Sequence, residues 1–321
     1  MGRSVNRILV LAADEDDGLG SAIRRAVGDT DYVVRPRVRT VGELRELLPE
    51  ADIVVGDWSG ALPLGSAEAA LAPRLKLLQQ PGVGVNFIDV GAWASVGVPV
   101  ANTPGANAAS VAEWAVVAAA SLSRSVHWAH AEVAAGRWPQ EAILSRRCRD
   151  LGELRIGIVG FGEIGRRCAA LFAAFGCDVA YSARTPRRDG TARFLPFRDL
   201  LKTAEVLVVA VPLTEETRGL ISAAALSALP SGALVVNVSR GEVVDETALV
   251  AALRSGTVAG AALDVFATEP LDPGSELRTL DTVLLSPHIA GGSATARQRI
   301  YSMTADNVAR VCAGDSPRWT V

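Results

Sequence analysis

RIGIVGFGEIGRRCAALFAAFG, residues 155–176, decides the fold. The stretch begins with an apolar strand pattern, continues with the glycine motif GFGEIG and then becomes helical. Between a strand and a helix, each glycine of a GxGxxG motif has a physical task. Gly160 permits the tight turn, Gly162 lets the backbone approach a pyrophosphate, and Gly165 lets the helix pack closely on the strand. The stretch therefore predicts a dinucleotide site; the alternative is a glycine-rich turn without a ligand.

The helix that follows this motif predicts further phosphate contacts. It begins near Glu163 and Ile164, and the first N–H groups of a helix have no partner within the helix. These groups and the positive end of the helix dipole attract phosphate oxygens. We therefore expect the backbone of Glu163 and Ile164 to join the three glycines in cofactor binding.

The end of the next strand predicts which dinucleotide binds. A site for NAD usually has Asp or Glu there, to bind the ribose 2′-hydroxyl. This strand reads DVAYSARTPRR, so Asp178 comes too early and Ala183 occupies the expected position. The residues that follow include Arg184, Thr185, Arg187 and Arg188. Because guanidinium groups suit a 2′-phosphate, the sequence favours NADP over NAD; the alternative is a solvated basic loop.

Strand and helix patterns alternate along almost the whole chain. The strand patterns are continuous apolar runs, typical of parallel strands covered on both faces. They occupy residues 7–13, 32–36, 52–57, 76–84, 155–160, 178–182, 204–212, 233–239, 258–266 and 282–288. Since the connections have room for crossover helices, an α/β fold with two doubly wound parallel sheets is predicted. Residues 294–321 read as one amphipathic helix, a stop at Gly314 and an extended end.

Composition places the chain among soluble globular proteins. Of its 321 residues, 49% are hydrophobic and 21% are charged, which suits two domains with sizeable cores. The net charge of −3 indicates no nucleic-acid surface. Four acidic residues follow the first apolar run, and no apolar run reaches about 18 residues, so neither a signal peptide nor a membrane span is expected. We expect a cytoplasmic protein with no membrane or nucleic-acid partner.

Neither the cysteines nor two of the histidines predict a metal site. The cysteines lack CxxC spacing and are expected to be reduced thiols. They are Cys148, Cys168, Cys177 and Cys312. His127 and His130 lie three residues apart on a helix predicted over residues 123–138, and no third ligand is evident. An exposed or interface helix face is the better interpretation of this pair, and no bound metal is expected.

The third histidine, His288, lies between a proline and a glycine pair in LSPHIAGG, residues 285–292. One interpretation is a turn residue after a buried strand. The other is a proton carrier, because hydride addition to a carbonyl leaves an oxyanion that needs a proton donor. Histidine suits that task since it changes charge near neutral pH.

Seven motifs occur in order over essentially the whole chain. They are GVGVNFID (82–89), VANTPGANAASVAEWA (100–115), GIVGFGEIG (157–165), VPLTEETRGLI (211–221), VNVSRGEVVDETAL (236–249), GAALDVFATEP (260–270) and SPHIAGG (286–292). In these motifs the chain resembles the D-isomer-specific 2-hydroxyacid dehydrogenase family. The resemblance implies a flavodoxin-like substrate domain split between residues 1–99 and 291–321, and an inserted Rossmann cofactor domain, residues 100–290. It also implies a homodimer formed through the long helix near residues 108–123.

The resemblance further implies the roles of three residues. Arg240 would hold the carboxylate of a 2-oxo acid and polarise its carbonyl. His288 would give a proton to the carbonyl oxygen in reduction and take it back in oxidation, and Glu269 would bond the other imidazole nitrogen. The chemistry is consistent, because a guanidinium binds a carboxylate through two parallel hydrogen bonds. Arg240 and His288 also follow predicted strands, at the sheet edge where open α/β sheets bind ligands.

Other site residues follow from the resemblance. The backbone amides of Val83 and Gly84 would bind the substrate carboxylate, and Asp264 would accept a hydrogen bond from the nicotinamide carboxamide. The remaining cofactor contacts would be Val211, Pro212, Thr217, Val238, Ser239 and Gly291.

Three residues depart from the family pattern. Asn86 and Phe87 stand where the family usually has Asp and then Asn, which bears on the substrate loop and not on the fold. Trp114 stands where a smaller or different ring residue is common. It either shapes the pocket or packs in the core.

These features predict an NAD(P)-dependent D-2-hydroxyacid dehydrogenase that reduces a small 2-oxo acid such as glyoxylate or hydroxypyruvate. Within the same enzyme class, the alternative is oxidation of 3-phosphoglycerate in serine synthesis. An alternative of another class is a non-catalytic NAD(P)-sensing protein, like the corepressors that share this fold.

Overall fold

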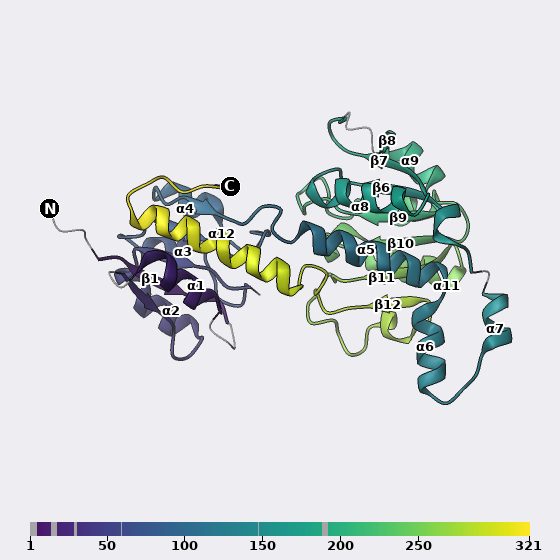
Figure 1. The fold of residues 1–321 in the computed structure, drawn as a ribbon, viewed down its shortest axis with the longest axis horizontal. Coiled ribbons are helices and arrows are strands. Elements are labelled where there is room, and N and C mark those ends of the chain that lie inside the picture. Colours follow the sequence, from purple (N-terminus) through teal and green to yellow (C-terminus); the bar gives the residue numbers. More distant parts are fainter. Residues whose placement is uncertain (1–4, 14–17, 29–30, 59, 147, 188–191) are drawn as a thin grey trace. The chain divides into compact units, whose positions relative to one another are not determined.

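A computed structural model describes residues 5–13, 18–28, 31–58, 60–146, 148–187 and 192–321. Its backbone divides into two compact units, Met1–Asn107 with Ala294–Val321, and Ala108–Ser293. We call the first the split unit and the second the inserted unit (Figure 1). The domain limits that the family resemblance implies stay a prediction.

The split unit contains a five-stranded parallel sheet with the strand order β2-β1-β3-β4-β5. Its strands are β1 (Arg7–Val10), β2 (Tyr32–Val34), β3 (Ile53–Val55), β4 (Leu77–Gln79) and β5 (Val100–Ala101). Four of them lie in the predicted apolar runs, and only the two-residue β5 was not predicted. The predicted doubly wound topology is confirmed for this unit.

Helices cover both faces of this sheet and bury one core on each. One core joins the sheet to α1 (Gly18–Val27) and α12 (Ala294–Cys312). The other joins it to α2 (Val41–Leu47), α3 (Ser66–Ala70) and α4 (Val90–Ser95). The predicted tail helix is α12, and Gly314 follows it with a φ of +89°, a left-handed conformation that ends helices.

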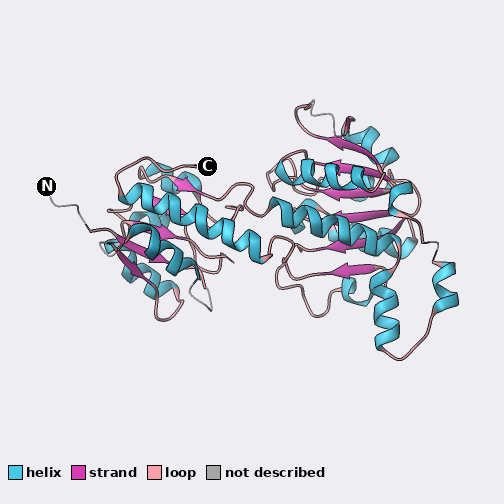
Figure 2. Cartoon of the chain, in the orientation of Figure 1, coloured by secondary structure: helices cyan, strands magenta, loops and turns pink. Residues whose placement is uncertain are grey.

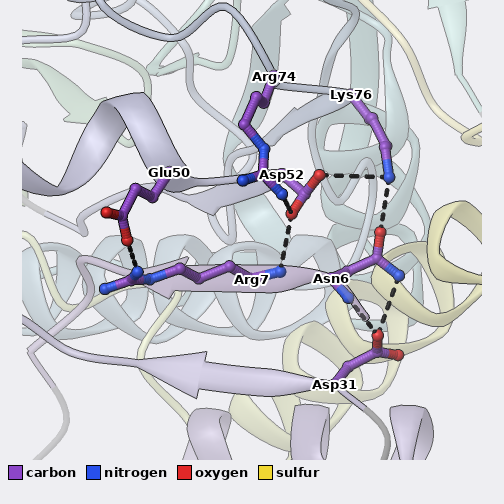
Figure 3. A network of polar contacts seen from close by, with 7 residues as sticks. All are labelled: Asn6, Arg7, Asp31, Glu50, Asp52, Arg74 and Lys76. Carbon is purple, nitrogen blue, oxygen red and sulfur yellow. Dashed lines mark hydrogen bonds and ion pairs between the residues drawn. The ribbon is translucent and has the colours of Figure 1, made fainter. Parts of the chain in front are cut away.

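A polar network closes the amino-terminal edge of this sheet (Figure 3). The buried carboxylate of Asp52 accepts from the Arg7 amide at 3.0 Å and lies 3.1 Å from Arg74 Nη2 and 3.3 Å from Lys76 Nζ. The Asp31 carboxylate accepts from the backbone and side chain of Asn6 at 2.7 and 3.0 Å. Arg7 also pairs with Glu50, and Lys76 with Asn6. Charges at this edge are therefore paired locally.

The inserted unit contains a seven-stranded parallel sheet with the order β12-β11-β10-β9-β6-β7-β8. Its strands are β6 (Arg155–Val159), β7 (Asp178–Ser182), β8 (Arg193–Phe194), β9 (Val206–Val209), β10 (Ala233–Asn237), β11 (Val258–Leu263) and β12 (Val283–Leu285). Only β8 was not predicted. From β8 to β11 the order is that of a Rossmann sheet, with β12 added at one edge.

Two helical layers cover this sheet (Figure 2). One core joins it to α5 (Ala108–Ser123) and α8 (Glu163–Ala174), and the other to α9 (Phe197–Thr203), α10 (Ala223–Ser227) and α11 (Glu246–Ser255). Four short 3₁₀ helices complete the described chain, at Leu48–Glu50, Leu151–Glu153, Gly241–Val243 and Glu276–Thr279. Within the described ranges, no helix combines the length and the apolar character needed to span a bilayer.

The region predicted as one helix over residues 123–138 is different. Ser125 has a φ of +49° and separates α5 from α6 (Val126–Ala134), and α7 (Gln140–Ser145) follows. The predicted helix is therefore present as α6 but is shorter, because it begins after Ser125 and ends at Ala134. The break at Ser125 has no proline or glycine, so the sequence carries no local signal for it. We call residues 126–145 the α6–α7 arm.

A buried asparagine ties the C-terminal residues to the split unit. Asn307 is fully buried, donates to Gln79 Oε1 at 2.6 Å and to the Arg318 carbonyl at 3.0 Å, and accepts from the Arg318 amide at 2.7 Å. We predict that Asn307→Ala lowers the free energy of unfolding by about 2–4 kcal/mol, because buried polar groups lose their partners.

Arg318→Ala is the matched control, since it removes an exposed ion pair with Asp306 and keeps the backbone bonds. It should cost less than about 1 kcal/mol. Urea denaturation followed by circular dichroism compares the two variants. Equal losses would show that the Asn307 side chain is not the tie.

Candidate functional site

The glycine loop after β6 meets the steric demands of its motif. Gly160 has a φ of +99°, and a Cβ there would lie 2.4 Å from the Ala210 carbonyl oxygen. A Cβ on Gly165 would lie 2.1 Å from the Gly160 carbonyl oxygen. Both positions therefore require glycine. At Gly162 a Cβ would meet no atom within 4 Å, so this residue borders open space, as the approach of a pyrophosphate to the backbone would require.

The first turn of α8 is also suited to an anion. Gly162 precedes the helix and provides no side-chain cap, whereas Ser222 and Asp245 cap α10 and α11. The Glu163 side chain pairs with Arg166, and Ile164 packs against the core. The backbone amides at the start of α8 thus fit the phosphates of a dinucleotide.

The basic loop after β7 is tied to the glycine loop. Ala183 packs partly against the core, while Arg184, Thr185 and Arg187 are exposed. The Tyr181 hydroxyl accepts from the Arg187 amide at 2.6 Å and donates to the Arg187 carbonyl at 2.5 Å. Its ring stacks on Phe161 of the glycine loop, with centroids 3.7 Å apart. Arg188 lies outside the described residues.

Two further loops lie at the carboxyl edge of the sheet. After β9 come Val211 and Pro212, whose carbonyl accepts from Thr217 Oγ1 at 2.6 Å. In the same turn, a hydrogen bond from Thr214 lowers the pKa of Glu216, and the charge of Arg184 contributes less. The basic loop is therefore close enough to this turn for the charge of Arg184 to act on Glu216.

The loop after β10 carries Val238, Ser239 and Arg240. Ser239 Oγ donates to Asn237 Oδ1 at 2.7 Å, and Arg240 Nη1 donates to the Ser239 carbonyl at 2.7 Å. Burial lowers the pKa of the Arg240 guanidinium, and the negative charges of Glu269 and Glu242 oppose that shift. The half-buried Arg240 guanidinium thus lies near Glu269 and is able to bind the carboxylate of a ligand.

Gly241 brings the Arg240 loop against the loop after β11. A Cβ on Gly241 would lie 1.8 Å from the carbonyl carbon of Phe266, so no other residue fits there without movement. The Phe266 amide donates to Glu269 Oε1 at 3.0 Å. This close backbone approach explains how Arg240 and Glu269 come together from different loops. The sequence predicted the arginine but not the role of this glycine.

Glu269 and His288 form a hydrogen-bonded pair. Glu269 Oε2 lies 2.8 Å from His288 Nδ1, and the side chains are 37% and 46% exposed. Since Nδ1 faces the carboxylate, Nε2 is the nitrogen left to exchange a proton with a ligand. The structure therefore brings together all three predicted catalytic residues in the inserted unit.

Asp264 holds the turn on which His288 lies. Its Oδ1 accepts from Ser286 Oγ at 2.5 Å and from the Ile289 amide at 2.8 Å, and its Oδ2 accepts from the Ala290 amide at 2.8 Å. The Asp264 carbonyl accepts from the His288 amide at 2.8 Å. Burial raises the pKa of the Asp264 carboxyl, and these hydrogen bonds oppose the shift.

His288 has a φ of +56°, a conformation that is uncommon for residues other than glycine. The Asp264 bonds keep it there, and such backbone outliers concentrate at functional sites. The contact of Asp264 with the nicotinamide stays a prediction, as does that of Gly291 in the same turn. Its part in fixing His288 was not predicted, because the three donors come from more than twenty residues later.

The remaining predicted residues are found on α5, on α6 and in the split unit. Trp114 on α5 packs against the core of the inserted unit. His130 is exposed as predicted, whereas His127 is half-buried, and burial lowers its pKa. In the split unit, Val83 and Gly84 are half-buried, Asn86 is exposed, and Phe87 packs against Gly60.

The described residues contain neither a disulfide nor a cluster of three or more potential metal ligands from His, Cys, Asp and Glu. Burial raises the pKa of Cys168 to about 12, which keeps it a thiol at neutral pH.

Comparison with known proteins shows the family of the chain. The sequence profile of the D-isomer specific 2-hydroxyacid dehydrogenase NAD binding domain matches residues 116–290. The chain is 39% identical to the glyoxylate reductase of Aeropyrum pernix over 77% of its own length and 76% of that protein. It is 34% identical to the hydroxypyruvate reductase of Thermotoga maritima, over 80% and 84%.

A solved structure agrees with the whole fold. The TT0316 protein of Thermus thermophilus superposes with a TM-score of 0.88 at 32% identity, over 98% of this chain and 99% of that one. The chain therefore belongs to the D-isomer specific 2-hydroxyacid dehydrogenase family, as an NAD(P)-dependent oxidoreductase.

Proposed function

We propose that this protein reduces a small 2-oxo acid of the glyoxylate or hydroxypyruvate type to the D-2-hydroxy acid, with NADPH as the preferred cofactor. One observation carries the proposal: the bond between Glu269 and His288 beside Arg240, at the sheet edge that also bears the glycine loop. The names of the Aeropyrum pernix and Thermotoga maritima relatives support the substrate type.

The three residues divide the work on the substrate. When bound, the nicotinamide would supply the hydride for the carbonyl carbon. The Arg240 guanidinium binds the carboxylate and polarises the carbonyl. His288 Nε2 donates a proton to the carbonyl oxygen, and the Glu269 carboxylate stabilises the imidazolium from which that proton leaves. In the oxidation direction, neutral His288 takes the proton back.

The substrate carboxylate has a second set of proposed partners. The amides of Val83 and Gly84 belong to the split unit and would donate to it. For the cofactor, we propose contacts through the glycine loop, the basic loop and the loops after β9, β10, β11 and β12. The side chains or amides involved are those of Glu163, Ile164, Arg184, Thr185, Arg187, Val211, Pro212, Thr217, Val238, Ser239, Asp264 and Gly291.

The proposal includes a homodimer in the cytoplasm. Ten residues of α5 are buried within its own unit, which leaves Val117 as its large exposed apolar side chain. Most of the nearby exposed apolar surface lies on the α6–α7 arm, at Val126, Val133, Trp138 and Leu144. This surface supports an interface that extends from α5 along the arm, and sedimentation equilibrium tests its stoichiometry.

The absence of a disulfide among the four cysteines supports a reducing compartment.

The cofactor preference is tested by nicotinamide absorbance, with glyoxylate, hydroxypyruvate and 3-phosphohydroxypyruvate as substrates. We predict a kcat/KM at least about tenfold higher with NADPH than with NADH, since a charged hydrogen bond contributes about 1.5–3 kcal/mol. Ala183→Asp should move the preference toward NADH, because the new carboxylate repels a 2′-phosphate. A wild-type preference for NADH would contradict the NADPH assignment. Fastest turnover of the phosphorylated acid would favour the phosphoglycerate alternative.

Arg240→Lys keeps the charge and removes the planar fork. We predict a loss of about 10²-fold or more in kcat/KM for 2-oxo acids, with NADPH affinity nearly unchanged. Arg218→Lys is the control, because Arg218 is exposed and pairs only loosely with Glu242, at 3.7 Å. Full turnover of the Arg240 variant would remove this residue from the site.

His288→Ala should lower reduction by about 10²- to 10⁴-fold while NADPH still binds. His130→Ala, which changes an exposed position on α6, is the control and should leave the rate of reduction unchanged. Glu269→Gln removes the charge that stabilises the His288 imidazolium, so it should lower the kcat/KM of reduction by about tenfold or more while NADPH still binds. Unchanged turnover of this variant would show that Glu269 does not act through His288.

A further inference from the structure

The loop Pro81–Gly84 of the split unit is held through its carbonyls. The Pro81 carbonyl accepts from Thr103 Oγ1 at 2.7 Å, the Gly82 carbonyl from the Thr103 amide at 3.4 Å, and the Val83 carbonyl from Asn102 Nδ2 at 2.7 Å. Three consecutive carbonyls of the loop thus point toward two consecutive residues that follow β5.

Fixing these carbonyls also fixes the amides of the loop. In a planar trans peptide, the carbonyl of one residue and the N–H of the next point in opposite directions. Holding the Val83 carbonyl on Asn102 therefore directs the Gly84 N–H away from β5, and holding the Gly82 carbonyl does the same for the Val83 N–H. Within the described part of the chain, neither amide has an acceptor, so both are available to a ligand.

Asn102 itself is held from two sides. The Gln80 amide donates to the Ala101 carbonyl at 2.7 Å, which pairs β5 with the strand that leads into the loop. On the other side, the Asn102 amide donates to the Trp319 carbonyl at 3.1 Å, and the Val321 amide to the Val100 carbonyl at 2.9 Å. The C-terminal residues, tied down by Asn307, thus pair with the outer edge of β5. Asn102 is 8% exposed and Thr103 is fully buried.

We propose that Asn102 is a positioning residue for the substrate carboxylate, acting through the Val83–Gly84 peptide. The inference rests on the proposed function, in which the Val83 and Gly84 amides receive that carboxylate. Without the Asn102 hydrogen bond the Val83–Gly84 peptide can rotate, and a donor that leaves its position is lost to the substrate but not to the cofactor.

The test compares Asn102→Ala and Asn102→Asp with the wild type. Asn102→Asp keeps the shape and replaces the donor by an acceptor. We expect KM for glyoxylate, or for hydroxypyruvate if that is reduced faster, to rise about tenfold or more in both variants, as positioning losses do. The Kd of NADPH, measured by fluorescence, should stay within about twofold. The preference for the 2-oxo acid over its primary amide should shrink, because the lost contact is to the carboxylate.

Thr103→Val is the matched control. It also removes one side-chain hydrogen bond of 2.7 Å to the loop, but from the Pro81–Gly82 peptide, which carries neither proposed amide. It should lower the melting temperature and leave KM and the acid-over-amide preference unchanged. If Asn102→Ala does not fold, Asn102→Ser, which keeps a short hydroxyl, replaces it beside Asn102→Asp.

The outcomes separate the two levels of the proposal. A wild type that reduces no 2-oxo acid overturns the proposed function. A wild type that does, with folded Asn102 variants of unchanged KM, overturns the positioning role alone. Equal loss of turnover for the acid and its amide would show a structural effect and would also overturn it.

Discussion

The site depends on one buried carboxylate. Asp264 lies at the end of β11, and its carboxylate accepts three hydrogen bonds from the turn after β12. Adjacent parallel strands end at the same edge, so a short side chain from one can reach the turn that follows the next. Through these hydrogen bonds β11 holds the turn in which His288 has a left-handed backbone conformation, with its Nδ1 beside the Glu269 carboxylate. The proposed proton carrier is therefore oriented before any ligand arrives, as efficient catalysis requires.

Both units use the backbone in a comparable way. In the inserted unit, Gly241 lets two loops touch so that Arg240 and Glu269 become neighbours. In the split unit, side chains after β5 hold the carbonyls of the Val83–Gly84 loop. In each unit, residues that need not contact a ligand themselves orient the groups proposed to contact it. The chemistry thus depends on glycine packing and peptide planarity as much as on charged side chains.

Much of this could be predicted from the sequence. Continuous apolar runs marked ten of the twelve strands in the described residues, because strands buried on both faces need apolar residues throughout. β5 and β8 have two residues each and are too short for any pattern. The break at Ser125 has no local cause in the sequence. Arg240, Glu269 and His288 were predicted from motifs, whereas the bonds of Asp264 and Asn102 are long-range and appear only in the folded chain. NADP preference, the dimer and the domain limits stay predictions.

The polar network at the amino edge of the split unit has a consequence for strand alignment (Figure 3). β2, β3 and β4 have three residues each, so few ladder bonds resist a slip of one residue. Asp52 is bonded to the start of β1 and to the residues before β4. A shifted strand would carry the buried Asp52 carboxylate away from these donors, and a buried polar group left without its partners costs about 1–3 kcal/mol. These ion pairs therefore help to fix the strand register. They disfavour shifted strand pairings, which the apolar faces of the sheet alone would tolerate.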